Sequence, residues 1–148
     1  MSRHSSALAG PPSPAAIKSM AAIVGVLALG VLVQAVTSGV FAREPNREGW
    51  INAHLGVAYV VALLALAAVV VALGMWRGKV GAPVVIAETV ALLVAVVVQV
   101  GIGPQIGRLD KAGAHPGLLV VHIPLALIIF GLALHLSTYV ANLRRSSH

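Results

Sequence analysis

The residues of this sequence best suited to chemistry are histidines that lie inside apolar, helix-length runs. His122 and His135 stand near the two ends of one such run, which extends from Gly117 to Tyr139. An imidazole in a lipid-crossing helix is unfavourable unless it faces a partner, a cavity or a metal. The chain has no cysteine, so any metal chemistry must use histidine, whose neutral ring is a good ligand for iron.

A third histidine, His54, matches His122 in an internal repeat. In the first copy Gln34 precedes a glycine, a polar loop and His54, and in the second copy Gln99 precedes a glycine, a polar loop and His122. Each copy contains two spans, so both copies enter the membrane in the same direction. The repeat therefore predicts that His54 and His122 lie at one depth and face each other, as the two axial ligands of a haem iron would.

Composition indicates an integral membrane protein. Of the 148 residues, 59% are hydrophobic and 9% are charged, and the mean hydropathy of +0.97 is far too high for a soluble domain. The formal net charge of +6 could suit nucleic acid, but the basic residues flank apolar runs and form no patch with interleaved aromatic residues. We therefore expect the lipid bilayer as a partner, and no nucleic acid.

Four apolar runs are each long enough to cross a bilayer. They lie at about residues 20–42, 50–76, 83–103 and 117–140. The expected fold class is all-α: an integral membrane four-helix bundle built from two tandem helical hairpins that are related by a pseudo-twofold axis. The transmembrane domain is expected at 17–141, between a disordered cytoplasmic tail at 1–16 and a short cytoplasmic tail at 142–148.

Prolines and tryptophans mark the expected ends of the spans. Pro83 and Pro116 suit the first turns of the third and fourth spans, where the N–H that proline lacks is not needed. Trp50 and Trp76 suit opposite membrane interfaces, where the ring is in apolar surroundings and its N–H can reach water. The residues 104–115 are expected to form the longest polar connection.

The distribution of lysine and arginine predicts the orientation of the bundle. One side carries Arg3, Lys18, Arg77, Lys79, Arg144 and Arg145. The other side carries Arg43, Arg47, Arg108 and Lys111, which haem propionates would meet if they point outward. Because the side richer in positive charge stays inside, both termini are expected in the cytoplasm of a cell-membrane protein. The first span is longer than a typical signal-peptide core, so it is expected to be a retained anchor.

The repeated pattern of a glutamine near a helix end, an outer loop and a helix that opens on a histidine resembles one four-helix half of the haem A synthase family. The similarity covers nearly all of residues 20–140. It implies a b-type haem, haem b, held between His54 and His122. The family's catalytic half has a glutamate three residues before the ligand and an arginine after it, where this chain has Ile51 and Leu55. These differences favour an electron-transfer or accessory protein over a stand-alone enzyme.

The other polar residues of interest have structural and functional interpretations. His135 has Ala67 opposite it in the repeat, so it either bonds a neighbouring helix or belongs to a second, incomplete site. His115 is expected to be a helix cap or a proton-accessible surface group. Gln34 and Gln99 could bond across helices, which is the more common role, or contact a ligand.

Three functions fit these residues. A cytochrome with two imidazole ligands has no open coordination position, so it would transfer electrons, with a quinone or another redox membrane protein as partner. A non-catalytic accessory or scaffold subunit of a larger membrane complex, in a homo- or hetero-oligomer, would have its histidines satisfied by hydrogen bonds. A haem- or lipid-handling membrane protein would hold its ligand reversibly.

Overall fold

The structure, a computed structural model, describes residues 10–41, 48–77, 79–111 and 119–145. These residues are almost entirely helical, and no strand occurs among them. The elements are α1 (Pro14–Phe41), α2 (Glu48–Val71), the π-helix η1 (Ala72–Trp76) that continues α2, α3 (Ala82–Lys111) and α4 (Leu119–Arg145). The all-α fold class that we predicted is confirmed.

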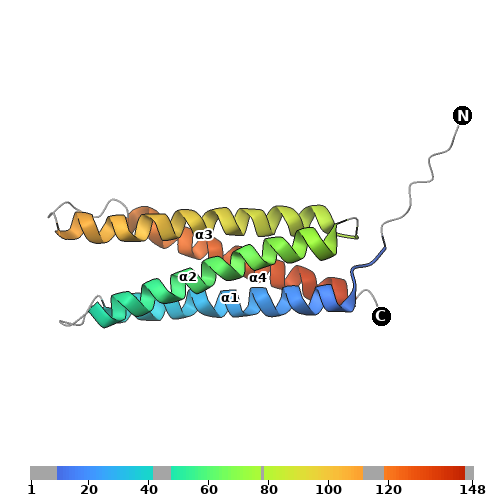
Figure 1. Cartoon of the computed structure of the whole chain (residues 1–148), viewed down its shortest axis with the longest axis horizontal. Helices are drawn as coiled ribbons and strands as arrows, with labels where there is room; N and C mark the ends of the chain where they lie inside the picture. Colours follow the sequence, from blue (N-terminus) through green and yellow to red (C-terminus); the bar gives the residue numbers. More distant parts are fainter. Residues whose placement is uncertain (1–9, 42–47, 78, 112–118, 146–148) are drawn as a thin grey trace, which may run out of the picture.

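The four long helices form one bundle in which each helix packs against two others (Figure 1). α1 contacts α2 and α4, and α3 also contacts α2 and α4, so α2 and α4 lie diagonally across the bundle from each other. The start of α1, the α2–α3 turn and the end of α4 lie at one end of the bundle, which we call the terminal end. The opposite end, with the end of α1 and the start of α4, is the loop end.

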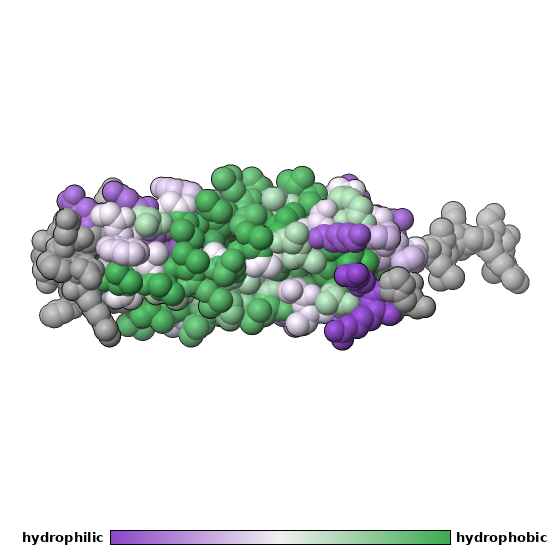
Figure 2. Space-filling view, turned by 90° about the horizontal axis from the view of Figure 1, so that it is seen from below, coloured by the Kyte–Doolittle hydropathy of each residue, from purple (hydrophilic) through white to green (hydrophobic). Residues whose placement is uncertain are grey.

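Each long helix has the length and composition of a membrane span. The apolar segments are Pro14–Val40, Glu48–Trp76, Ala82–Ile106 and Val120–Arg145. Their most apolar windows have mean hydropathies of 2.1 to 2.8, yet only 17% to 28% of each window is buried inside the bundle. Figure 2 shows the result, a broad apolar band between two more hydrophilic ends. Helices that are apolar on all sides suit a lipid environment, which confirms the four predicted spans.

Alanines and larger apolar side chains together fill the contacts between the helices, while many other large apolar side chains cover the outside. Ala65 and Ala133 are fully buried, whereas 68% of Leu127 is exposed. This distribution suits a bilayer, because close backbone packing stabilises helix pairs where lipid removes the hydrophobic driving force. α1 and α2 approach closely at Gly30, where an added Cβ would lie 2.7 Å from Val61 Cγ2.

The first helix begins earlier than predicted. Ser13 caps α1, because its Oγ accepts a hydrogen bond from the backbone N–H of Ala16 at 3.1 Å. Pro14 follows at the first helical position, where proline is favoured. The carbonyl of Gly10 accepts a hydrogen bond from the N–H of Val80 in the α2–α3 turn at 3.1 Å. These residues were expected in the disordered tail, but they belong to the folded domain.

The third helix extends further than predicted. The residues from 104 on were expected to form a polar connection, but α3 continues to Lys111 with Pro104 inside it. Pro104 has no N–H to donate to the carbonyl of Val100, so the helix loses one bond there without ending. The apolar segment stops at Ile106. Hydropathy marks only the part of a helix that suits lipid, which is why the predicted span was too short.

The prolines and tryptophans that were expected at the ends of the spans agree with the structure in part. Pro83 lies in the first turn of α3 as expected, and Pro116 lies outside the described residues. Trp50 is exposed at the loop end, which suits an interface. Trp76 differs from the prediction, because it is fully buried at the terminal end and its Nε1–H donates to the carbonyl of Val80 at 3.2 Å. The turn itself supplies the hydrogen-bond partner that was expected from interfacial water.

Candidate functional site

Two glutamine side chains bond the backbone of the two predicted histidines in the same way. Gln34 Nε2 on α1 donates to the carbonyl of His54 on α2 at 2.7 Å, and Gln99 Nε2 on α3 donates to the carbonyl of His122 on α4 at 3.0 Å. We call each pair a Gln–His clamp. A partly buried amide in lipid needs such a partner, so each clamp ties two neighbouring helices together at the level of a histidine.

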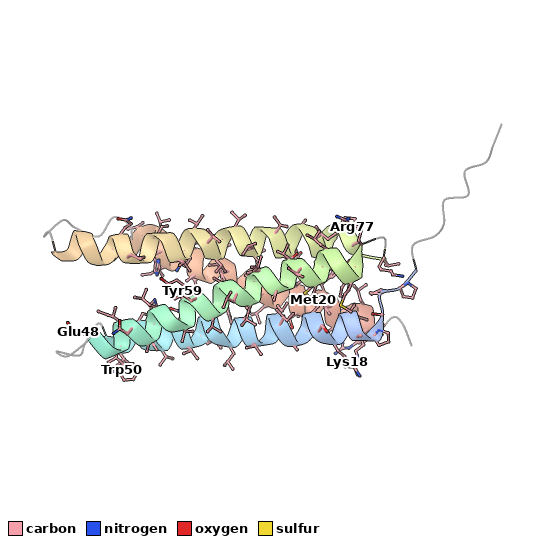
Figure 3. The ribbon with its side chains drawn as sticks, viewed as in Figure 1. Lys18, Met20, Glu48, Trp50, Tyr59 and Arg77 are labelled. Atoms are coloured by element: carbon pink, nitrogen blue, oxygen red, sulfur yellow. The ribbon has the colours of Figure 1, made fainter. Side chains whose placement is uncertain are left out.

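Both clamps lie near the loop end, on diagonal helices. His54 stands six residues after Glu48, the first residue of α2, and His122 stands three residues after the start of α4. At about 1.5 Å per residue these offsets are roughly 9 and 4.5 Å. Both histidines are half-buried. Figure 3 shows Glu48 at this end of the bundle and Arg77 at the other.

The hydroxyl of Thr37 orients the His54 ring. Thr37 is buried, and its Oγ1 lies 3.1 Å from His54 Nδ1. The same hydroxyl donates its single proton to the carbonyls of Val33 and Gln34, which lie 3.0 and 3.1 Å away. Its lone pairs are then left to accept a hydrogen bond from His54 in the tautomer that carries its proton on Nδ1. This tautomer places the ring's lone pair on Nε2, the nitrogen that would then ligate a metal.

The His122 ring lacks an equivalent hydroxyl. The residue three positions after Gln99 is Ile102, where the first copy of the repeat has Thr37. His122 Nδ1 and Gln99 Oε1 are both buried and have no hydrogen-bond partner among the described residues. Because buried polar atoms are rarely left unsatisfied, these two atoms indicate a place for an additional polar or metal group. A Cβ at Gly103 would lie 3.9 Å from His122 Cε1, so an alanine there would be in ordinary van der Waals contact with the ring.

Small residues follow both histidines on the same helix faces. Ala58 and Ala126 each stand four residues after their histidine, about one turn further along the helix, and both are partly buried. Gly56 stands two residues after His54 and is exposed, so it adds no space at the ring. The interior beside the two rings is therefore bounded by alanine methyl groups at matching positions.

Most of the charged residues predicted for this site fall outside the described part of the chain. Arg43, Arg47 and His115 are among the residues whose structure is not described. Arg108 and Lys111 belong to the last turns of α3, although their side chains are not described. Those last turns are at the loop end, where both clamps also lie. The pairing of these cations with propionates stays a prediction.

His135 belongs to a different part of the bundle. Its Nδ1 lies 2.7 Å from Oε1 of Glu88 on α3, and it is separated from His122 by 13 residues, or roughly 20 Å along α4. The side chain of Glu88 is only 17% exposed, and its Oε2 is buried without a partner among the described residues. Of the two predicted roles for His135, the contact favours a bond to a neighbouring helix. Glu88 is a lone carboxylate inside an apolar span, and this is the sequence signal that could have indicated the pair.

The donor set at the loop end suits some metal groups better than others. Within the described ranges, no group of three or more histidine, cysteine or acidic side chains could hold a metal ion together. A structural zinc site needs four such ligands, whereas an iron already held in a macrocycle needs only two axial ones. No protein-family model, curated protein or solved structure matches the chain. The likeness to haem A synthase therefore stands on the repeated sequence pattern alone.

Proposed function

We propose that the protein binds one b-type haem between His54 and His122, near the extracytoplasmic face of the cell membrane, and transfers electrons. The single observation that carries this proposal is the pair of matched Gln–His clamps, which hold the two histidines near one end of two diagonal helices. Diagonal helices have the bundle interior between them, and a macrocycle with two axial imidazoles needs its ligands on opposite sides.

The residues around the histidines fit this role in two ways. The Thr37 hydroxyl lies 3.1 Å from His54 Nδ1, where it can accept a hydrogen bond from the Nδ1–H and leave the Nε2 lone pair available for coordination. On the other side, a bridging polar group would satisfy the two buried atoms, His122 Nδ1 and Gln99 Oε1, and would leave His122 Nε2 for coordination. When bound, an iron with two imidazole ligands supplies one-electron transfer and has no open coordination position.

The proposal extends to the symmetry and orientation of the bundle. The spacing of the repeat and the matched clamps support a pseudo-twofold axis along the membrane normal. The excess of lysine and arginine on the side of the termini supports cytoplasmic tails. A quinone or a redox membrane protein would then exchange electrons with the site from the membrane.

The test is the visible absorption spectrum of the purified protein supplied with haem. We expect a low-spin spectrum with one haem per chain, because two imidazoles complete the coordination of the iron. His54→Ala or His122→Ala should abolish that spectrum. His135→Ala is the matched control, since it removes a membrane histidine that lies far from the site, and it should retain the spectrum.

Folding must be measured alongside, by circular dichroism and by gel filtration in detergent. A folded wild-type protein that takes up no haem would contradict the proposal. So would a His54→Ala, His122→Ala double variant whose spectrum is unchanged.

A second candidate function, a non-catalytic accessory subunit, is favoured by one contact. The His54 ring already bonds the Thr37 hydroxyl, so this histidine can be satisfied in lipid without a metal. Such a subunit would stay folded and haem-free when haem is supplied. It would also remain bound to a larger membrane complex during mild solubilisation, whereas a haem-handling protein would show reversible occupancy.

A further inference from the structure

A groove at the terminal end combines an apolar floor with three cations. It is lined by Ile17, Lys18 and Ala21 from α1 and by Val140, Ala141, Arg144 and Arg145 from α4. Its volume is about 560 Å³. Ile17 and Val140 are buried, whereas all three cationic residues are exposed. The groove therefore has a hydrophobic base and a cationic rim, formed by the first and last helices of the chain.

The charge on this rim is not compensated within the described part of the chain. No acidic residue lines the groove, and Lys18, Arg144 and Arg145 form no ion pair with another described residue. The two arginines lie in the last turn of α4, where they also complement the helix dipole. A guanidinium group matches two phosphate oxygens at once, and a lysine adds a compact charge beside it. The rim therefore suits a phosphate ester.

The position of the groove adds an apolar requirement to this chemistry. Hydrophilic side chains gather at the terminal end, directly beside the apolar band that suits the hydrocarbon core (Figure 2). Figure 3 shows Lys18 on the outside of α1 at this end. Ala21 and Val140 lie on the membrane side of the cations, so the floor runs toward the acyl region. A soluble phosphate compound would use the rim only, whereas a phospholipid would use both parts.

We infer that this groove binds an anionic phospholipid of the cytoplasmic leaflet, with its phosphate at Lys18, Arg144 and Arg145 and an acyl chain on the floor. Basic pockets between transmembrane helices on the cytoplasmic side are suited to anionic headgroups. A second groove, between α2 and α3, provides the contrast. It is lined by Tyr59, Ala62, Leu63, Leu66, Leu93 and Val97, and it has no cation to select a headgroup.

Native mass spectrometry of the purified full-length protein in non-ionic detergent tests the inference. The probes are phosphatidylglycerol and phosphatidylcholine with the same acyl chains, added in equal amounts. We expect retention of the anionic lipid in preference to the zwitterionic one by about tenfold, because each cation near a headgroup adds favourable electrostatic energy. Arg144→Gln with Arg145→Gln should remove most of that preference.

Two further variants separate a built site from general positive charge. Arg77→Gln with Lys79→Gln removes two cations from the same end of the bundle but outside the groove, so the preference should remain. Ala21→Phe keeps all charges but fills the apolar floor at an exposed position, so lipid retention should fall severalfold. Circular dichroism confirms that each variant is folded.

Three outcomes would overturn the inference. Equal retention of the two lipids by the wild-type protein would show that the groove selects no headgroup. Equal losses in the two double variants would assign the effect to overall charge. Competition by glycerol phosphate as effective as that by the lipid would identify a soluble phosphate ester as the ligand. None of these measurements depends on haem.

Discussion

The two histidines of the candidate site are matched in backbone contacts but differ in what their rings touch. Both carbonyls accept a hydrogen bond from a glutamine amide. Only His54 has a hydroxyl partner, Thr37, because the corresponding residue near His122 is Ile102. A ligand whose second nitrogen donates a hydrogen bond is more basic and stabilises the oxidised metal better. The two imidazoles are therefore expected to contribute unequally to a reduction potential.

At the residue scale, Thr37→Val should raise the midpoint potential of the bound haem. The substitution removes the hydroxyl beside His54 Nδ1 while keeping the volume of the side chain, so hydrogen bonding to the ring weakens and the ligand becomes less electron-donating. Ile102→Thr is the matched change in the second copy of the repeat, and it should lower the potential by offering His122 a hydroxyl. Redox titration followed by absorbance measures both. If neither potential moves, the assignment of the Nδ1 proton is wrong.

At the scale of the helices, polar contacts support two of the four packed pairs, α1 with α2 and α3 with α4. Helices that are apolar on all sides gain little from burial in a bilayer, so interhelical hydrogen bonds and close packing provide specificity. The two clamps connect α1 with α2 and α3 with α4 near the loop end. The contact between Glu88 and His135 connects α3 with α4 closer to the terminal end.

Removing one clamp should destabilise the haem-free bundle measurably. Gln34→Leu or Gln99→Leu deletes the amide that bonds a histidine carbonyl, and the expected loss is about 1 kcal/mol for each. Gln105→Leu is the control, because Gln105 lies on the exposed surface of α3. Unfolding in detergent micelles gives the three free energies. Clamp variants as stable as the Gln105 variant would show that the clamps add no net stability.

The Glu88–His135 contact should behave as a coupled pair. His135→Leu leaves a mostly buried carboxyl group without its partner, so we expect a loss of about 1 to 3 kcal/mol. Glu88→Leu with His135→Leu removes both polar groups, and replacing a whole buried pair by apolar residues is often neutral. The double variant should therefore be more stable than His135→Leu alone. Additive losses in this double-mutant cycle would show that the two residues act independently, and the haem spectrum should not change in any of these variants.

At the scale of the whole molecule, the bundle is apolar outside and basic at the terminal end. Large exposed residues such as Leu63 and Val70 would be unfavourable in water but suit acyl chains. Both of these distributions follow from a position across a bilayer. The orientation that we propose for the bundle rests on the side on which the basic residues gather.

The orientation can be measured with single cysteines, which this cysteine-free chain makes simple to interpret. Arg77→Cys and Arg144→Cys, at the terminal end, should react with a membrane-impermeant thiol reagent only after the membrane is opened. Gly49→Cys, at the exposed start of α2, should react in intact cells. The reverse pattern would place the termini outside, and the groove between α1 and α4 would then face the wrong leaflet for the proposed lipid.

Much of this molecule follows from the sequence, because a bilayer imposes its requirements on each segment separately. A span must be long and apolar whatever its neighbours are, so the four helices and the all-α class can be predicted from local composition. The repeat also predicted matching positions for His54 and His122, and an interhelical bond was one of the two roles expected for Gln34 and Gln99. Helix ends were less predictable, because Ser13 and Pro14 continue α1 beyond the apolar run and α3 continues past Pro104.

Only the tertiary structure decided which side chains meet. The partners Thr37 with His54 and Glu88 with His135 depend on how each helix is rotated about its axis, and a helix that is apolar on every side does not encode that rotation in its hydropathy. The burial of Trp76 depends in the same way on the packing at the end of the bundle. The groove between α1 and α4 joins residues from opposite ends of the chain, and no local pattern could bring them together.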